Sequence, residues 1–459
     1  MPAIPFKAVE CLPSPCLCQI STRIAATLLC LTLLTACQSD KGLNQTEASV
    51  AAISYGENPA LVEPETSLIP TINIAKAVGW QYEEMPTSPI ADLVVNKFAA
   101  GLDHPRWLYR LPNGDILVAE SNKPDKHDKN GGLVAWAQDK VMAAAGAGVK
   151  SADRITLLRD TNNDGVADLQ KVFLQNLHSP FGMTLVDNTL YVANTDAIVA
   201  YSYEPDQTHI TAAGRILTSL PAGEINHHWT KNLLASQDGR TLYVAVGSNS
   251  NIAENGFDVE SQRAAILAVN IASGVKRIFA SGLRNPVGMA WVGNTLWTAV
   301  NERDELGDNL VPDYMTSVQE NAFYGWPYSY FGQNLDTRVE QNNPQLVQQA
   351  IKPDYALGAH TASLGLLYGD TTHSLGPLTT GMYVGQHGSW NRKPKSGYKV
   401  VFVPFKDGLP AGLPQDVLSG FVNDKGQAQG RPVGVIFSQT GDLLVADDVG
   451  NVIWRVSER

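Results

Sequence analysis

Residues 285–301 read NPVGMAWVGNTLWTAVN, an apolar strand followed by a Gly-Asn turn and a second apolar strand. Similar two-strand phrases lie at residues 104–120, 179–194, 229–247 and 432–447, with a looser sixth copy near residues 381–390. Repeated phrases of this kind, spaced by longer polar segments, are typical of a β-propeller, in which each blade is a small sheet that packs against its neighbours. The sequence therefore predicts an all-β propeller over residues 91–459.

The composition limits the size and the partners of this domain. With 459 residues, of which 44% are apolar, the chain can bury a large core as one propeller domain. The formal net charge is -11, and no segment is dense in Lys or Arg. Because nucleic-acid binding requires a concentrated basic surface, we expect no nucleic-acid partner.

All five cysteines precede the repeats, so the propeller sequence offers no disulfide and no C-x-x-C-H haem motif. Arg23 and an apolar run at residues 24–34 lead to the tetrapeptide LTAC, which ends at Cys37. This order is typical of a secretory signal, and the tetrapeptide resembles a bacterial lipobox. We expect residues 1–36 to be a lipoprotein-type signal peptide and Cys37 to be lipidated, with a plain signal peptide or a short anchor as the alternative.

The segment at residues 37–90 is rich in Ser, Thr, Asn, Glu and Pro and shows no sustained period. Such a composition predicts a flexible tether between a lipid anchor and the propeller. Gln38 and Ser39 lack the Asp signal for retention in the inner membrane. We therefore expect a periplasmic, membrane-anchored lipoprotein, with the outer membrane favoured.

An acidic segment, RDTNNDGVAD at residues 159–168, contains oxygen-bearing side chains at alternating positions and a glycine for a sharp turn. This spacing suits a hard cation such as Ca²⁺. The terminal Glu of an EF-hand is missing, so a dockerin-like or thrombospondin-like loop fits better, and an ion-free hairpin of Asx turns is the alternative. The candidate ligands are Asp160, Asn162, Asp164 and Asp168.

A pair of histidines, His227 and His228, begins one repeat in the phrase NHHWTKNL. Neighbouring residues of an extended strand point to opposite faces, so only one of the two can face a given cavity. Histidine is the natural proton acceptor at neutral pH. A surface or packing role is the alternative for each.

Basic residues stand at the start of other repeats. Arg284 and Asn285 precede one blade, and Arg431 precedes another in the same way. Trp390 and Arg392 lie together in HGSWNR, where they could hold a flat ring. Three arginines converging on one end of the axis would suit a small polyanionic ligand, although inter-blade salt bridges are the alternative.

Ten phrases cover the chain from about residue 98 to its end. They are, in order, GLDHPRWL, LPNGDILVAES, RITLLRDTNNDG, SPFGM, HHWTKNL, GLRNP, VNERDELGDNL, FYGWP, HGSWNR and RPVGV. At these phrases the chain resembles the pyrroloquinoline quinone (PQQ) dependent sugar dehydrogenases of the soluble aldose and L-sorbosone type. The resemblance implies a six-bladed propeller that binds PQQ and Ca²⁺ and oxidises an aldose or a related sugar alcohol or aldehyde.

The resemblance also assigns roles to residues. The catalytic His of the family corresponds to His228, as the general base that removes the hydroxyl proton while hydride leaves for the quinone. The PQQ-contacting pair corresponds to Arg284 and Asn285, and Arg284 would stabilise negative charge on the quinone oxygen. Further candidates for binding PQQ are Arg392, Arg431, Trp390 and, more weakly, Lys231.

The calcium of the active site departs from the family pattern. Glucose-type members use backbone oxygens of a Gly-Pro pair after a Glu, whereas here Glu302 is followed by Arg303 and Asp304. Tyr324 of FYGWP, with Asp313, matches a separate structural calcium of some members. Glu302, Asp304, Asp313 and Tyr324 are thus further metal candidates, and a calcium at the quinone would act as a Lewis acid.

Without a haem motif, electrons must pass to an external acceptor such as a quinone or a cytochrome. Two other functions remain open for this sequence. One is a calcium-dependent lactonase on a similar propeller, and the other is a non-catalytic binding propeller at the cell surface.

Overall fold

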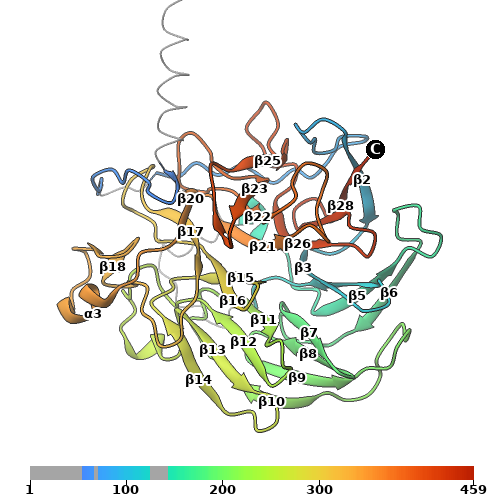
Figure 1. Cartoon of the computed structure of the whole chain (residues 1–459), viewed down its shortest axis with the longest axis horizontal. Coiled ribbons are helices and arrows are strands. Elements are labelled where there is room, and N and C mark those ends of the chain that lie inside the picture. Colours follow the sequence, from blue (N-terminus) through green and yellow to red (C-terminus); the bar gives the residue numbers. More distant parts are fainter. Residues whose placement is uncertain (1–53, 67–70, 125–142) are drawn as a thin grey trace, which may run out of the picture. The chain divides into compact units, whose positions relative to one another are not determined.

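Six antiparallel sheets follow one another in sequence order around a central axis in the described part of the chain (Figure 1). The computed structural model describes residues 54–66, 71–124 and 143–459. The first strands of neighbouring sheets contact one another, so they line the axis, and the later strands lie successively further out. The predicted six-bladed β-propeller is confirmed.

Blades 1 to 3 are four-stranded meanders, and their first two strands are the two-strand phrases of the sequence. Blade 1 contains β3 (Pro105–Arg110), β4 (Ile116–Glu120), β5 (Arg154–Arg159) and β6 (Leu169–Leu174). Blade 2 contains β7 (Met183–Val186), β8 (Thr189–Ala193), β9 (Ala197–Ser202) and β10 (Arg215–Ser219). Blade 3 contains β11 (Lys231–Ala235), β12 (Thr241–Val246), β13 (Ala265–Asn270) and β14 (Lys276–Ser281).

Blades 4 to 6 carry additional or exchanged strands. Blade 4 contains β15 (Pro286–Val292), β16 (Thr295–Val300), β17 (Pro312–Ser317), β20 (Tyr355–Ala359) and β1 (Tyr55–Gly56). Blade 5 contains β21 (Ser363–Gly369), β22 (Gly381–Gln386) and β23 (Lys399–Lys406), with β24 (Leu409–Pro410) and β25 (Gln415–Leu418) both paired to β23. Blade 6 contains β26 (Pro432–Phe437), β27 (Leu443–Asp447), β28 (Val452–Glu458) and β2 (Leu93–Ala100).

The ring closes through blade 6, whose outermost strand comes from the N-terminal side of the propeller. β2 pairs antiparallel with β28, from Leu93 opposite Glu458 to Ala100 opposite Val452. This pairing joins the two ends of the propeller in one sheet and covers the outer edge of β28.

The sixth copy of the repeat is out of phase with the other five, which corrects our prediction. The segment at residues 381–390 begins with β22, the second strand of blade 5, and the first strand is β21. Residues 370–380 separate these two strands, where other blades have a short turn. The long connection breaks the two-strand phrase, so β21 was not recognised.

Glycines of the repeat allow the first strands to approach one another closely. A Cβ at Gly182 would lie 2.3 Å from the backbone nitrogen of Leu233 in the next blade. A Cβ at Gly288 would lie 2.6 Å from the carbonyl oxygen of Leu364. Both distances are shorter than carbon can approach these atoms, which explains the glycine in SPFGM and in NPVGM.

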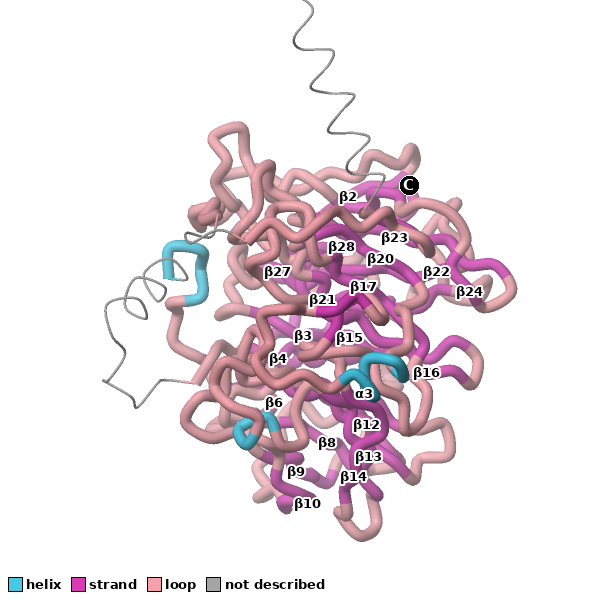
Figure 2. Tube along the Cα trace, turned by 90° about the vertical axis from the view of Figure 1, so that its left-hand side faces the viewer, coloured by secondary structure: helices cyan, strands magenta, loops and turns pink. Residues whose placement is uncertain are grey.

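Helices are few and short in the described chain, and they lie in loops outside the blades (Figure 2). They are the single turns η1 (Ala143–Ala147), η2 (Asp258–Glu260) and α3 (Pro344–Gln349), and a small hairpin, β18 (Ser329–Tyr330) and β19 (Asn334–Leu335), precedes α3. None of the helices in the described ranges has the length and the apolar content needed to cross a membrane.

The described part of the expected tether lies along the blades. β1 pairs with β20, the backbone N–H of Val78 donates to the carbonyl of Ala428 at 2.8 Å, and the indole of Trp80 donates to Asp447 at 2.6 Å. The domain boundaries at residues 36 and 90 stay predictions. The expected signal peptide and Cys37 lie outside the described residues.

Candidate functional site

Each blade repeats the same antiparallel order, so the first strands all begin at one end of the axis. We call this end, formed by the residues before each first strand and by the loops after each second strand, the axial end. Most of the expected site residues belong to it. The segment of Asp160 to Asp168 does not, because it joins the two outer strands of blade 1.

His228 lies at the axial end, three residues before β11. Its Nδ1 lies 2.8 Å from the carbonyl oxygen of Ser248. A carbonyl oxygen only accepts hydrogen bonds, so Nδ1 carries the proton and Nε2 carries the lone pair. Burial lowers the pKa of the His228 imidazole well below its usual range. The neutral ring can therefore accept a proton at Nε2.

The side chains of Asn285 and His228 both lie against Gly247. A Cβ at Gly247 would lie 2.5 Å from the Cβ of His228 and 2.2 Å from Oδ1 of Asn285. Oδ1 of Asn285 is buried and has no hydrogen-bond partner in the described chain. The structure thus brings the expected base and the expected cofactor contact together, and it leaves one amide oxygen for a ligand.

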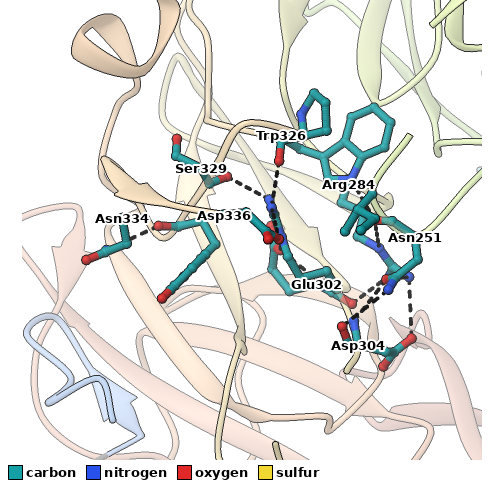
Figure 3. Close-up of polar contacts among 12 residues, drawn as sticks. Asn251, Arg284, Glu302, Asp304, Trp326, Ser329, Asn334 and Asp336 are labelled. Atoms are coloured by element: carbon teal, nitrogen blue, oxygen red, sulfur yellow. Dashed lines mark hydrogen bonds and ion pairs between the residues drawn. The ribbon is translucent and has the colours of Figure 1, made fainter. Parts of the chain in front are cut away.

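Arg284 lies at the axial end, and its side chain is 2% exposed. Figure 3 shows its polar contacts with Asn251 and Asp304. Its guanidinium donates to the carbonyl oxygen of Glu302 at 2.6 Å and to the side-chain oxygen of Asn251 at 2.9 Å. Its Nε donates to the carbonyl oxygen of Asn251, and the other edge lies 3.4 Å from Asp304. All three nitrogens therefore have acceptors within the protein.

Asp304 links Arg284 to Asn391 and His360, which were not among the expected site residues. Its Oδ1 accepts from Nδ2 of Asn391 at 2.8 Å and lies 3.4 Å from Nδ1 of His360. Burial alone would raise the pKa of Asp304, but the hydrogen bond to His360 and the charge of Arg284 hold it below its usual range. No repeat phrase contains His360, so only the fold places it here.

A second polar cluster surrounds Asp448, whose side chain is 1% exposed. Arg106 lies 2.5 Å, His387 2.9 Å and His104 3.5 Å from this carboxylate. Burial lowers the pKa of His387 to about 4, so Arg106 is the cation that pairs with Asp448 at neutral pH. The cluster was not among the predicted sites, although HPRWL opens a repeat as GLRNP does.

The guanidinium of Arg106 also lies near the residue that follows the expected base in the chain. It is 5.8 Å from the ring of Trp229, the residue that follows His228. The Asp448 cluster therefore contacts the segment that carries His228 through the side chain of Trp229.

The other expected PQQ contacts hold loops in place. The buried amine of Lys231 donates to the carbonyl oxygen of Trp229 at 3.0 Å, and burial lowers its pKa well below the usual value. Arg431 lies over the ring of Tyr398, at 4.7 Å, and donates to the carbonyl oxygen of Gly388 at 3.2 Å.

Arg392 makes a similar set of bonds in the neighbouring loop. It donates to the carbonyl oxygens of Asp308 and Pro394, each at 2.8 Å, and to the side chain of Asn309 at 3.0 Å. Trp390 is half-buried, and its carbonyl oxygen accepts from Asn73 at 2.8 Å. The roles of Lys231, Arg392, Arg431 and Trp390 toward PQQ stay predictions.

The acidic loop between β5 and β6 uses its carboxylates internally. Asp160 accepts from the backbone N–H of Gly165 at 2.7 Å, and Asp168 accepts from the hydroxyl of Thr161 at 2.7 Å. The side-chain amide of Asn162 donates to Asp164 at 3.1 Å. These bonds are those of an Asx-turn hairpin. Over residues 54–66, 71–124 and 143–459, no three His, Cys, Asp or Glu side chains form a group that could hold a metal.

Glu302 belongs to a buried ion network with Arg303. Oε2 of Glu302 lies 3.1 Å from Arg303, which lies 3.1 Å from Asp336. Arg303 also donates to the carbonyl oxygens of Pro327 and Ser329, at 2.8 and 2.6 Å. This network connects the segment of Glu302 and Asp304 to the loop that carries β18 and β19.

The remaining metal candidates are also engaged by protein groups. Asp313 accepts from the backbone N–H groups of Glu302 and Ser363, at 2.9 and 2.7 Å. The hydroxyl of Tyr324 donates to the carbonyl oxygen of Ser317 at 2.7 Å. Neither contact brings these two side chains together in one site.

Comparisons with known proteins identify the family. A family model described as TrAA12-like matches residues 90–322 and 311–459. An uncharacterized protein of Borreliella burgdorferi is 28% identical over 294 residues, which cover 61% of this chain and 76% of that protein. A pyrroloquinoline quinone-dependent pyranose dehydrogenase of Coprinopsis cinerea is 27% identical over 356 residues, which cover 64% of this chain and 48% of that protein. This chain thus spans about half the length of the pyranose dehydrogenase.

Solved structures share the fold at lower identity. The holo form of the PQQ domain of that pyranose dehydrogenase superposes with a TM-score of 0.64 at 21% identity, over 84% of this chain and 100% of that one. The calcium structure of a family AA12 protein from Trichoderma reesei gives 0.66 at 16% identity, over 85% and 99%. The family match extends over nearly the whole propeller, and it confirms the resemblance to PQQ-dependent sugar dehydrogenases: this chain belongs to the TrAA12-like family.

Proposed function

We propose that this protein is a PQQ-dependent oxidoreductase that oxidises an aldose or a related sugar alcohol or aldehyde. The observation that carries the proposal is the neutral His228, with its lone pair on Nε2, at the axial end of a TrAA12-like propeller. The pyranose dehydrogenase relative, whose name states PQQ dependence, supports the cofactor and the substrate class.

The residues of the axial end fit a small polar anion such as PQQ. Nε of Arg106 and Oγ of Ser179 are buried without partners in the described chain and can donate to an anion. Oδ1 of Asn285 and of Asn391 also have no partners there, and as acceptors they suit an N–H or hydroxyl group of a ligand. Buried polar atoms in folded proteins are nearly always hydrogen-bonded, so these atoms call for a polar ligand. When bound, PQQ would supply the two-electron acceptor for the hydride of the substrate.

His228 would act as the general base in this reaction. Its Nε2 takes the proton of the sugar hydroxyl, while the carbonyl of Ser248 holds the proton on Nδ1 and fixes the tautomer. Asn285, packed against His228 over Gly247, would orient the ligand. Arg284 contributes a fixed positive charge at the axial end, which favours negative charge developing nearby.

Calcium is the second expected cofactor, and the calcium structure from Trichoderma reesei supports it. The carboxylates that we expected to hold it at the axial end, Glu302, Asp304 and Asp313, are bonded to protein groups, and their role toward the metal stays a prediction. No step of the proposed reaction therefore uses the metal.

The test is reconstitution of the purified protein with PQQ and Ca²⁺, followed by titration with a panel of aldoses. We expect sugar-dependent bleaching of the quinone absorbance and reduction of an added dye. His228→Ala should lose this activity by a factor on the order of 10²–10⁴ and still bind PQQ. Absence of PQQ binding would refute the proposal, and lactone hydrolysis without PQQ would favour a lactonase.

We further propose that Cys37 carries a lipid that anchors the protein to the periplasmic face of the outer membrane, from which electrons pass to an external quinone or cytochrome. The lipobox-like tetrapeptide supports this location. Cys37→Ser should move the protein from the membrane fraction to the soluble fraction and abolish labelling by radioactive palmitate. Unchanged labelling would contradict lipidation at this residue.

A further inference from the structure

Arg106 is a largely buried arginine with unused hydrogen-bond donors. It is the second residue of β3, and its side chain is 12% exposed. One of its nitrogens donates to Asp448 at 2.5 Å, and its buried Nε has no partner in the described chain. A guanidinium has five N–H donors, so most of the donors of Arg106 remain for a ligand.

The other arginines of the axial end differ in this respect. Arg284 donates from all three nitrogens to groups on the protein, and so does Arg392. Arg431 donates from two nitrogens and lies over the ring of Tyr398, so that only its Nε has no partner in the described chain. Arg106 therefore has more unused hydrogen-bond donors than these three arginines, although the sequence patterns did not indicate it.

The position and orientation of Arg106 suit a planar anion. Asp448 holds one edge of the guanidinium, and this carboxylate is itself fixed by His387 at 2.9 Å. The guanidinium carbon lies 5.8 Å from the ring of Trp229, the residue that follows His228 in the chain. A guanidinium that is held on one side can donate two parallel N–H bonds from its other side to a carboxylate.

We propose that Arg106, oriented by Asp448, binds a carboxylate of the cofactor at the axial end. This assignment rests on the proposed function, because PQQ supplies three carboxylates. A sugar acid carries the same group, so the test must separate a cofactor carboxylate from a substrate carboxylate.

The experiment is an equilibrium titration of the apoprotein with PQQ, comparing the wild type with Arg106→Gln. Removal of a hydrogen-bonded charge should weaken PQQ binding by at least about 10-fold. Arg110→Gln is the matched control, because Arg110 lies on the same strand and also makes one bond to blade 6, to the carbonyl oxygen of Ser438 at 2.5 Å. Its affinity for PQQ should stay within about 2-fold of the wild type, since a neutral contact far from the ligand is lost.

Two further measurements keep the result interpretable. The trimethyl ester of PQQ should bind the wild type more weakly than PQQ does, and this difference should shrink in Arg106→Gln. Arg106→Lys keeps a positive charge beside Asp448 and replaces the glutamine variant if that variant does not fold, as judged by its melting temperature. It should lose part of the affinity, because it lacks the fork.

The outcomes are distinguishable. If the wild type binds PQQ and Arg106→Gln binds it equally well, the assignment of Arg106 is wrong and the proposed function stands. If the variant raises only the KM for a uronic acid relative to an aldose, Arg106 contacts the substrate, and the assignment is wrong as well. If the wild type does not bind PQQ, both proposals fail.

Discussion

At the scale of single residues, the surroundings of a histidine determine which of its ring nitrogens can accept a proton. His227 and His228 are neighbours of the same type, but Nδ1 of His228 bonds to the carbonyl oxygen of Ser248, which leaves Nε2 as a base. The sequence could place a histidine at the start of the blade. The tautomer depends on Ser248, which follows β12, and no local pattern reports that contact.

The pH dependence of the reaction tests this tautomer and its burial. Burial lowers the pKa of His228, so the ring stays neutral, and active as a base, below the usual histidine pKa. We expect the acid limb of kcat/KM for sugar oxidation to lie below pH 6.5, the ordinary value for histidine. His228→Ala should abolish this limb, and a limb centred above pH 6.5 would contradict the burial of the base.

At the scale of elements, a buried arginine joins a long loop to the axial end. Arg303 is fully buried between the carboxylates of Glu302 and Asp336. Arg303→Met would leave both carboxylates buried without the positive charge of Arg303. We therefore expect the free energy of unfolding, measured with urea, to fall by about 3–5 kcal/mol.

A surface pair provides the control for Arg303. Arg240 is 83% exposed and lies 4.0 Å from Asp238. Arg240→Met should change the free energy of unfolding by less than about 0.5 kcal/mol. An equal loss of unfolding free energy in both variants would show that the buried network stabilises the fold no more than the surface pair does.

The segment before β2 is a second element that tests the fold. Trp80 donates to the buried Asp447 at 2.6 Å and packs edge-on against Trp454. Trp80→Phe keeps a ring but removes the donor, so we expect a loss of about 1.5–3 kcal/mol in the free energy of unfolding by urea. Tyr82→Phe, two residues away and 92% exposed, is the control and should be neutral within about 0.5 kcal/mol. Equal stability of both variants would mean that Trp80 does not hold this segment.

At the scale of the whole molecule, the repeat predicted the propeller because the features that define a blade lie within a few neighbouring residues. Apolar alternation, a short turn and a glycine at the axis stand within one phrase, as at Gly288. Arg284, Asn285 and His228 were found for the same reason, since they precede such phrases. His360 and Asp448 were not found, because they reach the axial end only when blades distant in sequence come together. Blade 5 was misjudged where its first turn is long.

Ring closure can be tested by truncation. A chain that begins at residue 102 lacks β2 and leaves β28 as an exposed edge. We expect it to give less soluble protein and a lower melting temperature than a chain that begins at residue 91, which keeps β2 and likewise lacks β1 and Trp80. Equal melting temperatures would show that three strands suffice for blade 6.

The pairing of β2 with β28 also has a mechanical consequence. The strands run antiparallel, and the start of β2 lies beside the end of β28, where the backbone N–H of Arg459 donates to Asp92 at 3.0 Å. A force pulling these two points apart would peel the strands one bonded pair after another, which resists load poorly compared with shear. Tension arriving from the N-terminal side would first meet the pairing of β1 with β20 and then the contact of Trp80 with Asp447. These contacts would therefore carry load before the pairing of β2 with β28 does.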